Sequence, residues 1–252
     1  MRPFTYVRAT AAAAAAMVAA SVPNSAIAQS STSGSPVGSV SELTLSPKQQ
    51  AIAPISAATA IGDIPRLNQA LNEGLDAGLT LSETKEILVQ MYAYTGFPRS
   101  LNALGELMKV VDARKQRGVQ DAPGREAGPV PRGQELLDLG TANQTKLIGA
   151  PARGPLFEFS PVIDEYLKSH LFGAIFARDN LDWQSRELAT LGALSAMPGV
   201  ESQLQSHVGF SMNIGLTAEQ LRLLADVLAQ RGYPEAAGRA RAAIALVEAA
   251  KK

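Results

Sequence analysis

Two ionisable side chains on consecutive predicted helices could form a proton-transfer pair. Glu187 lies on the predicted helix that begins at Asp182, and shares a face with Leu191 and Leu194 at spacings of four and seven residues. A carboxylate among core positions is costly unless it is paired or hydrogen-bonded. His207, on the next predicted helix, lies at the edge of an apolar stripe. If these helices run antiparallel, Glu187 could meet His207, fix the imidazole tautomer and stabilise its protonated form.

The neighbours of these two residues allow both a catalytic and a structural interpretation. Arg186 could clamp the carboxylate group of a substrate. Alternatively, Glu187 is partly exposed and pairs with Arg186 or Arg222, and His207 is a structural residue at a helix edge. His170, in the stretch KSHLFGAIF, has no comparable partner and is interpreted as structural or as part of a rim. The residue types alone therefore make the pair a candidate site and do not decide between these interpretations.

The elements that must position these residues are predicted to be helices throughout. Alanine and leucine dominate, and strand-like alternation is scarce. Capping boxes, in which the N-cap hydroxyl and the third helical side chain satisfy each other's backbone donors, are predicted at 46–49, 80–83 and 217–220. Gly-aromatic-Pro stretches at 96–98 and 232–234 predict helix ends, because glycine tolerates a left-handed cap and proline cannot continue the helix. We therefore expect an all-α fold.

The same start and stop signals indicate an internal repeat. Residues 77–104 and 214–240 both run through Gly-Leu-Thr, a capping box, an amphipathic helix, an aromatic-Pro turn and a second helix. We expect two tandem helical lobes, although two unrelated hairpins with ordinary caps would give a similar pattern. The expected first lobe is 45–117, the Gly- and Pro-rich linker is 118–133, and the second lobe is 134–252.

The first 28 residues have the three-part layout of a secretory signal peptide. Arg2 and Arg8 precede a short alanine-rich apolar run, and small residues at the −3 and −1 positions predict cleavage after Ala28. An alanine-rich leader without this role is the alternative. The run is too short and too weakly apolar for a membrane span, which needs about 20 residues. We expect export to the periplasm or the medium, with residues 29–44 as a flexible linker.

The composition argues against several classes of site and partner. The 252-residue chain contains no cysteine, which excludes disulfides, thiolate metal sites, cysteine nucleophiles and dithiol redox centres. The presence of two histidines argues against a multi-histidine metal site. Cleavage after residue 28 would remove two of the 23 basic residues and leave 21 against 23 acidic ones, a formal charge of −2. That balance does not favour binding to nucleic acid or to an anionic membrane.

Residues 171–221, continuing to the RGYPEA stretch at 231–236, resemble the carboxymuconolactone decarboxylase family. The shared features are a Phe-Gly element, a Leu-Asp…Arg-Glu-Leu helix, a Gln-Leu…His helix and an Asn-x-Gly-Leu-Thr turn. Residues 72–104 resemble a second copy. The resemblance implies an all-α fold of helical hairpins that assemble into rings, often trimers or hexamers, with no organic or metal cofactor. We accordingly expect a homo-oligomer that acts on a small molecule.

Two branches of this family differ in their chemistry. The name-giving members decarboxylate 4-carboxymuconolactone, whereas alkylhydroperoxidase D-like members use a Cys-x-x-Cys pair assisted by a glutamate and a histidine. In that pattern the second cysteine precedes the histidine by four residues, where this chain has Gln203, with Val200 three residues earlier. Dithiol peroxidase chemistry is therefore excluded for this chain.

The relay positions of the family are matched in one lobe only. Glu187 and His207 match them, whereas the first lobe has Ala51 and Ala70 at the corresponding positions. We expect the first lobe to act as a built-in partner that covers apolar faces of the second lobe.

We expect a cofactor-independent lyase that decarboxylates, or shuttles protons on, a small lactone or keto acid. Loss of CO2 leaves an enolate-like anion, which needs a positive or hydrogen-bonding environment and then a proton. The expected roles are carboxylate anchoring by Arg186, protonation by His207, orientation of the imidazole by Glu187 and oxyanion donation by Gln203. Because the resembled pathway is intracellular, the expected export argues against 4-carboxymuconolactone itself as the substrate.

The alternative is a non-catalytic oligomeric binding or scaffold protein, which predicts that Glu187 and His207 lie more than about 5 Å apart.

Overall fold

The computed structural model describes residues 44–251, and every regular element in this range is a helix. The prediction of an all-α fold is confirmed. The predicted signal peptide, with its cleavage after Ala28, and all but the last residue of the predicted 29–44 linker lie outside the described residues. None of the helices in the described range is long and apolar enough to cross a membrane.

The helices before the 118–133 connection begin and end near the predicted signals. They are α1 (Pro47–Gln50), α2 (Ile52–Ile61), α3 (Ile64–Asp76) and α4 (Leu81–Gln116). Both predicted capping boxes are present, because the hydroxyls of Ser46 and Thr80 accept from the third helical N–H and the third side chain bonds back. The predicted helix end at 96–98 appears as a break within α4, where Gly96 has a φ of 80° and a ψ of 159°.

The helices after the connection include the expected hairpins and an irregular π-helical segment. They are α5 (Gln134–Ile148), α6 (Pro155–Phe159), α7 (Pro161–Tyr166), the π-helical η2 (Leu167–Ile175), α8 (Trp183–Ala196), α9 (Glu201–Asn213), α10 (Ala218–Gln230) and α11 (Pro234–Ala250). The third capping box is present at Thr217. Gly232, with a φ of 83°, separates α10 from α11 at the predicted helix end.

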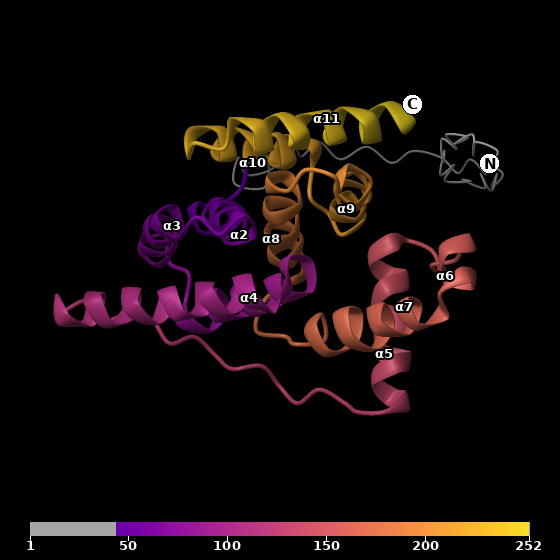
Figure 1. Cartoon of the computed structure of the whole chain (residues 1–252), viewed down its shortest axis with the longest axis horizontal. Coiled ribbons are helices and arrows are strands. Elements are labelled where there is room, and N and C mark those ends of the chain that lie inside the picture. The colour runs from indigo at the N-terminus through magenta and orange to yellow at the C-terminus, as the bar shows by residue number, and fades with distance from the viewer. Residues whose placement is uncertain (1–43, 252) are drawn as a thin grey trace, which may run out of the picture. The chain divides into compact units, whose positions relative to one another are not determined.

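Helices α2 and α8 cross inside the core. Residues 52–60 of α2 and residues 185–196 of α8 are all buried. The crossing is close because Gly192 has no side chain: a Cβ there would lie 2.5 Å from the carbonyl oxygen of Ala53. One cluster of buried apolar side chains includes residues of α2, α3, α4, α8, α9, α10 and α11. Helices from both sides of the 118–133 connection therefore share one core, with α8 running between α4 and α11 (Figure 1).

A second apolar cluster lies where α5 packs against η2. This packing is close because a Cβ on Gly140 would lie 1.7 Å from the carbonyl oxygen of Lys168. The cluster is rich in aromatic side chains, and Trp183 at the start of α8 packs against it. The side chain of Asn213 on α9 donates to the carbonyl of Ile148 at 2.8 Å. These contacts place an aromatic region beside α8 and α9, which carry the predicted site residues.

Candidate active site

Helices α8 and α9 bring Glu187 and His207 together in the core. Helix α8 begins where the carboxylate of Asp182 accepts hydrogen bonds from the backbone N–H and the hydroxyl of Ser185. Glu187 follows in the second turn, and its side chain is 0% exposed. The Nδ1 atom of His207 lies 2.8 Å from Oε2 of Glu187. The two residues form a buried hydrogen-bonded pair.

Aromatic rings surround the imidazole of His207. The ring of Phe210 lies 5.1 Å away and that of Tyr94 lies 5.8 Å away between centroids, both in edge-to-face geometry. The hydroxyl of Ser211 lies 3.5 Å from the Glu187 oxygen that binds the imidazole, at the limit of a hydrogen bond. Because Nδ1 is bound to Glu187, Nε2 is the ring nitrogen left for a substrate.

Tyr94 is a member of this site that the sequence patterns did not reveal. It lies on α4, two residues before the break at Gly96, and its buried hydroxyl makes no hydrogen bond of good geometry within the described residues. Burial raises the pKa of Tyr94 well above its ordinary value of 10.0, the charge of Glu187 adds to the rise, and the neighbouring Thr190 offsets part of it. Tyr94 is therefore a protonated phenol at neutral pH. No spacing within α4 signals this role, because the contact with His207 arises from the packing of separate helices.

Arg186 is buried, and its two terminal nitrogens are hydrogen-bonded inside the protein, whereas its Nε atom has no hydrogen-bond partner within the described residues. Its side chain is 0% exposed, and its guanidinium group lies 2.9 Å from Oε1 of Glu86 on α4. It also donates to Oε1 of Gln90 at 3.1 Å and to the carbonyl of Arg178 at 2.6 Å. Burial lowers the pKa of Arg186, and the charge of Glu86 offsets part of that effect. A substrate carboxylate could reach Arg186 only by displacing Glu86, so the geometry gives no support to the expected anchoring role.

Gln203 lies one turn before His207 on α9, on the exposed surface. Its Oε1 accepts a hydrogen bond from the hydroxyl of Ser202 at 2.9 Å, and it is not among the groups that hydrogen-bond to the pair. Of the four predicted site residues, the structure thus brings Glu187 and His207 together. It places Arg186 in the core and Gln203 at the surface.

The helices that carry the pair match a known family. Residues 161–249 match the model of the carboxymuconolactone decarboxylase family. This part of the chain is carboxymuconolactone decarboxylase-like. The match runs from the start of α7 almost to the end of α11, so it includes both members of the pair and confirms the resemblance seen in the motifs. No curated protein sequence matches the chain.

The carboxymuconolactone decarboxylase-like segment does not supply the whole site. Tyr94, which contacts the imidazole of His207, and Glu86, which binds Arg186, both lie on α4, outside the matched residues. The site therefore depends on the packing of α4 against α8.

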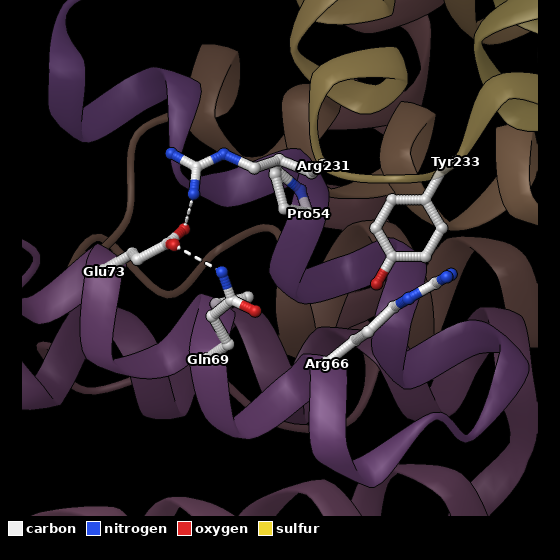
Figure 2. A pocket seen from close by; sticks show the side chains of 7 residues that line it. Pro54, Arg66, Gln69, Glu73, Arg231 and Tyr233 are labelled. Carbon is white, nitrogen blue, oxygen red and sulfur yellow. Dashed lines mark hydrogen bonds and ion pairs between the residues drawn. The ribbon is translucent and has the colours of Figure 1, made fainter.

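The predicted internal repeat aligns His207 with a residue in the first half of the chain that has no ionisable side chain. The offset of 137 residues between the two Gly-Leu-Thr turns places Ala70 there. Ala70 lines a pocket of about 30 Å³, which has room for about one water molecule. Figure 2 shows Arg231 pairing with Glu73 on one side of this pocket and Tyr233 next to Arg66 on the other. An ion pair thus occupies this region, whereas aromatic rings surround the imidazole in the second half.

Within residues 44–251, no group of three or more histidine, aspartate or glutamate side chains lies close enough together to hold a metal ion. The second histidine, His170, is exposed on η2, and its ring lies 5.3 Å from that of Tyr92.

Proposed function

We propose that the protein is a cofactor-independent lyase that decarboxylates a small lactone or keto acid by moving a proton at its reacting carbon. The 2.8 Å contact between Nδ1 of His207 and Oε2 of Glu187 carries this proposal. A carboxylate at this position accepts the Nδ1 proton, so it orients the ring and stabilises the imidazolium form. Nε2 is then the atom that gives the proton to the substrate.

In the proposed reaction, the bond between the carboxylate carbon of the substrate and the neighbouring carbon breaks. CO2 leaves, and the electron pair of that bond stays on the substrate as an enolate-like anion. Protonated His207 donates its Nε2 proton to the anionic carbon, which forms a C–H bond and leaves a neutral imidazole. Solvent then restores the proton, while Glu187 keeps the ring in place.

The neighbouring side chains define the remaining roles. Phe210 and Tyr94 flank the imidazole and would hold the apolar body of a small substrate. Gln203, which lies one turn before His207 on the exposed surface, stays the proposed oxyanion donor. We assign no substrate contact to Arg186, because Glu86 already neutralises its charge.

Substitution of His207 tests this mechanism. Purified protein is incubated in D2O with small lactones and keto acids, and CO2 release and deuterium incorporation into the product are measured. His207→Gln should lower the turnover of an accepted substrate by about 10²- to 10⁴-fold, the usual effect of losing a general acid. The matched control His170→Gln changes the exposed histidine and should leave turnover unaffected. Unchanged turnover by His207→Gln would sink the mechanism.

A non-catalytic oligomeric binding or scaffold protein is the second candidate. The enclosure of the pair favours it, because the Glu187 side chain is 0% exposed and the His207 side chain is only 10% exposed. The 2.8 Å separation speaks against it, since a site without a relay predicts a distance above about 5 Å. A lactone that raises the melting temperature of the wild-type protein but yields neither CO2 nor deuterated product would favour this candidate.

Peroxidase activity is the least supported candidate. Thiol-dependent reduction of a hydroperoxide needs a cysteine to be oxidised, and the chain has none. A standard hydroperoxide assay should therefore stay at background.

We also propose that the protein is exported and assembles with copies of itself. The proposal of export is supported by the signal-peptide layout of the first 28 residues, and N-terminal sequencing of the mature protein should start at Gln29.

The proposal of self-assembly is supported by apolar side chains on α6 and α7 that a second copy could cover, since Phe159 is 88%, Leu156 65% and Tyr166 60% exposed. A monomer mass in light scattering would contradict the proposed assembly.

A further inference from the structure

A cleft of about 400 Å³ lies between α5 and the segment that leads from η2 into α8. Leu139 and Asn143 of α5 line it, together with Phe176, Arg178 and Trp183. Its size falls in the range of small-molecule sites, roughly 300–1,000 Å³. Neither member of the Glu187–His207 pair lines this cleft, so it is a separate candidate site.

Arg178 presents a positively charged group to this cleft. The two carboxylate oxygens of Glu86 hold its Nε atom at 3.0 and 2.8 Å, which fixes the orientation of the guanidinium group. Its two terminal nitrogens, Nη1 and Nη2, make no hydrogen bond within residues 44–251. The side chain is 36% exposed, so part of it is open to solvent.

The charge around Arg178 is not balanced by Glu86. That carboxylate is shared with Arg186, whose guanidinium group lies 2.9 Å away and is fully buried. Two guanidinium groups on one carboxylate leave one positive charge, and Arg178 is the exposed end of the cluster. Placement of an anion at this end would therefore be favourable.

The two acidic residues that line the cleft already have partners. Asp179 binds the guanidinium group of Arg125 at 3.0 Å and accepts from the backbone N–H of Gly128 at 2.8 Å. Asp182 accepts from the backbone N–H and the hydroxyl of Ser185 at the start of α8. Arg125 thus balances the charge of Asp179, whereas Asp182 keeps its negative charge at the start of α8. Neither carboxylate hydrogen-bonds to the terminal nitrogens of Arg178.

Aromatic rings supply the apolar part of the cleft. The rings of Phe176 and Trp183 lie 6.0 Å apart between centroids, at an angle of 74°. The ammonium group of Lys146 lies 4.5 Å from the centre of the Trp183 ring and adds positive charge nearby. Aromatic pairs of this geometry favour the packing of a further flat ring against them.

We propose that this cleft binds an aromatic monocarboxylate. The carboxylate accepts hydrogen bonds from Nη1 and Nη2 of Arg178 in the bidentate geometry that arginine favours, and the ring packs against Phe176 and Trp183. This site goes beyond the function proposed for His207, because binding here requires no turnover.

The chain offers a direct probe of this cleft, since Trp183 is its only tryptophan. Benzoate is titrated into the full chain, and the fluorescence of Trp183 is recorded with excitation at wavelengths that benzoate does not absorb. We expect a saturable change in emission. Benzamide, a neutral molecule of the same shape, should bind at least about tenfold more weakly because it lacks the charge.

Two variants separate a specific anion site from a general charge effect. Arg178→Met keeps most of the side-chain length and should weaken benzoate binding at least about tenfold. The matched control Arg153→Met removes an exposed cation that does not line the cleft, and should bind benzoate as the wild type does. His207→Gln should also bind benzoate in this cleft as the wild type does, because His207 does not line it. The test of this cleft is therefore independent of the test of the proposed catalysis.

Several results would overturn the inference. They are the lack of a saturable emission change with benzoate, equal binding of benzoate and benzamide, and wild-type affinity in Arg178→Met. If Arg178→Met does not fold, the comparison of benzoate with benzamide on the wild-type protein decides alone.

Discussion

Glu86 on α4 and Arg186 on α8 form a buried ion pair across 100 residues of sequence, with 2.9 Å between Oε1 and Nη2. The side chain of Arg186 is 0% exposed and that of Glu86 is 2% exposed. This contact holds the helix that carries Tyr94 against the helix that carries Glu187. The geometry of the candidate site thus depends on an interaction between the carboxymuconolactone decarboxylase-like segment and the part of the chain before it.

Glu86→Gln should lower the free energy of unfolding by about 3 kcal/mol or more, because it leaves the buried guanidinium group of Arg186 without a negative partner. Urea denaturation measures this loss. The control Glu165→Gln makes the same change on the exposed surface of α7 and should stay within about 0.5 kcal/mol of the wild type. A loss below about 1 kcal/mol in Glu86→Gln would mean that the pair contributes no more than a surface ion pair does.

Gly192→Ala should destabilise the protein by about 1–3 kcal/mol, since the added Cβ would lie 2.5 Å from the carbonyl oxygen of Ala53 and force α2 away from α8. The same substitution at Gly238, a helical position in α11 with open space around it, should stabilise the protein by up to about 1 kcal/mol. Thermal and urea unfolding of the two variants give the comparison. Equal stability of both variants would argue against the close crossing of α2 and α8.

The stability of the protein should fall at alkaline pH, in part because of Tyr94. Burial, together with the charge of Glu187, raises the pKa of Tyr94, so the folded state holds this proton more tightly than the unfolded state. The resulting stability is present below the ordinary value of 10.0 and is lost as the pH rises above it, with a slope of at most about 1.4 kcal/mol per pH unit. Tyr233, whose pKa is also raised by burial, contributes in the same direction.

Tyr94→Phe separates the contribution of Tyr94 from that of Tyr233. Urea denaturation is measured from about pH 9 to about pH 11, roughly one unit on each side of the ordinary tyrosine pKa. Over this range the free energy of unfolding of Tyr94→Phe should decline less steeply than that of the wild type. A Tyr94→Phe curve parallel to that of the wild type would mean that the Tyr94 hydroxyl is not buried in the folded protein.

At acidic pH, the protein should lose stability in part because Glu83, in the capping box at the start of α4, becomes protonated. Burial alone would raise the pKa of Glu83, but the hydrogen bonds from Lys48 and Thr80 outweigh it and lower the pKa below 4.5. The stability that this carboxylate contributes is therefore present above pH 4.5 and is lost as the pH falls through the lower folded value. Glu83→Gln should show a shallower acid decline in urea denaturation, and an unchanged decline would contradict the role of these bonds.

Local signals in the sequence were enough to predict the helices and several of their ends. The capping boxes that begin at Ser46, Thr80 and Thr217 are present, and Gly96 and Gly232 break the helical path where expected. These features depend on residues three or four apart, so neighbouring positions in the sequence contain the information. The boundaries of the two predicted lobes stay a prediction.

The Glu187–His207 pair was also accessible from the sequence. Both residues share helix faces with apolar side chains, and a short turn joins α8 to α9, so the sequence allowed the two faces to meet. The roles of the neighbouring residues were not accessible in this way. Arg186 lies next to Glu187 in the sequence, yet helical geometry directs it toward Glu86 and Gln90 on α4.

The sequence by itself therefore determined the helical fold and several helix starts, and it made Glu187 and His207 a candidate pair, because each follows from spacing along one or two adjacent helices. Only the tertiary structure decided that Glu86 neutralises Arg186, that Tyr94 lies against His207, and that Arg178 faces a cleft beside Trp183. These contacts join residues about 100 positions apart or depend on the packing of several helices at once. Side-chain periodicity describes which face of a helix is buried, but it does not say which other helix covers that face.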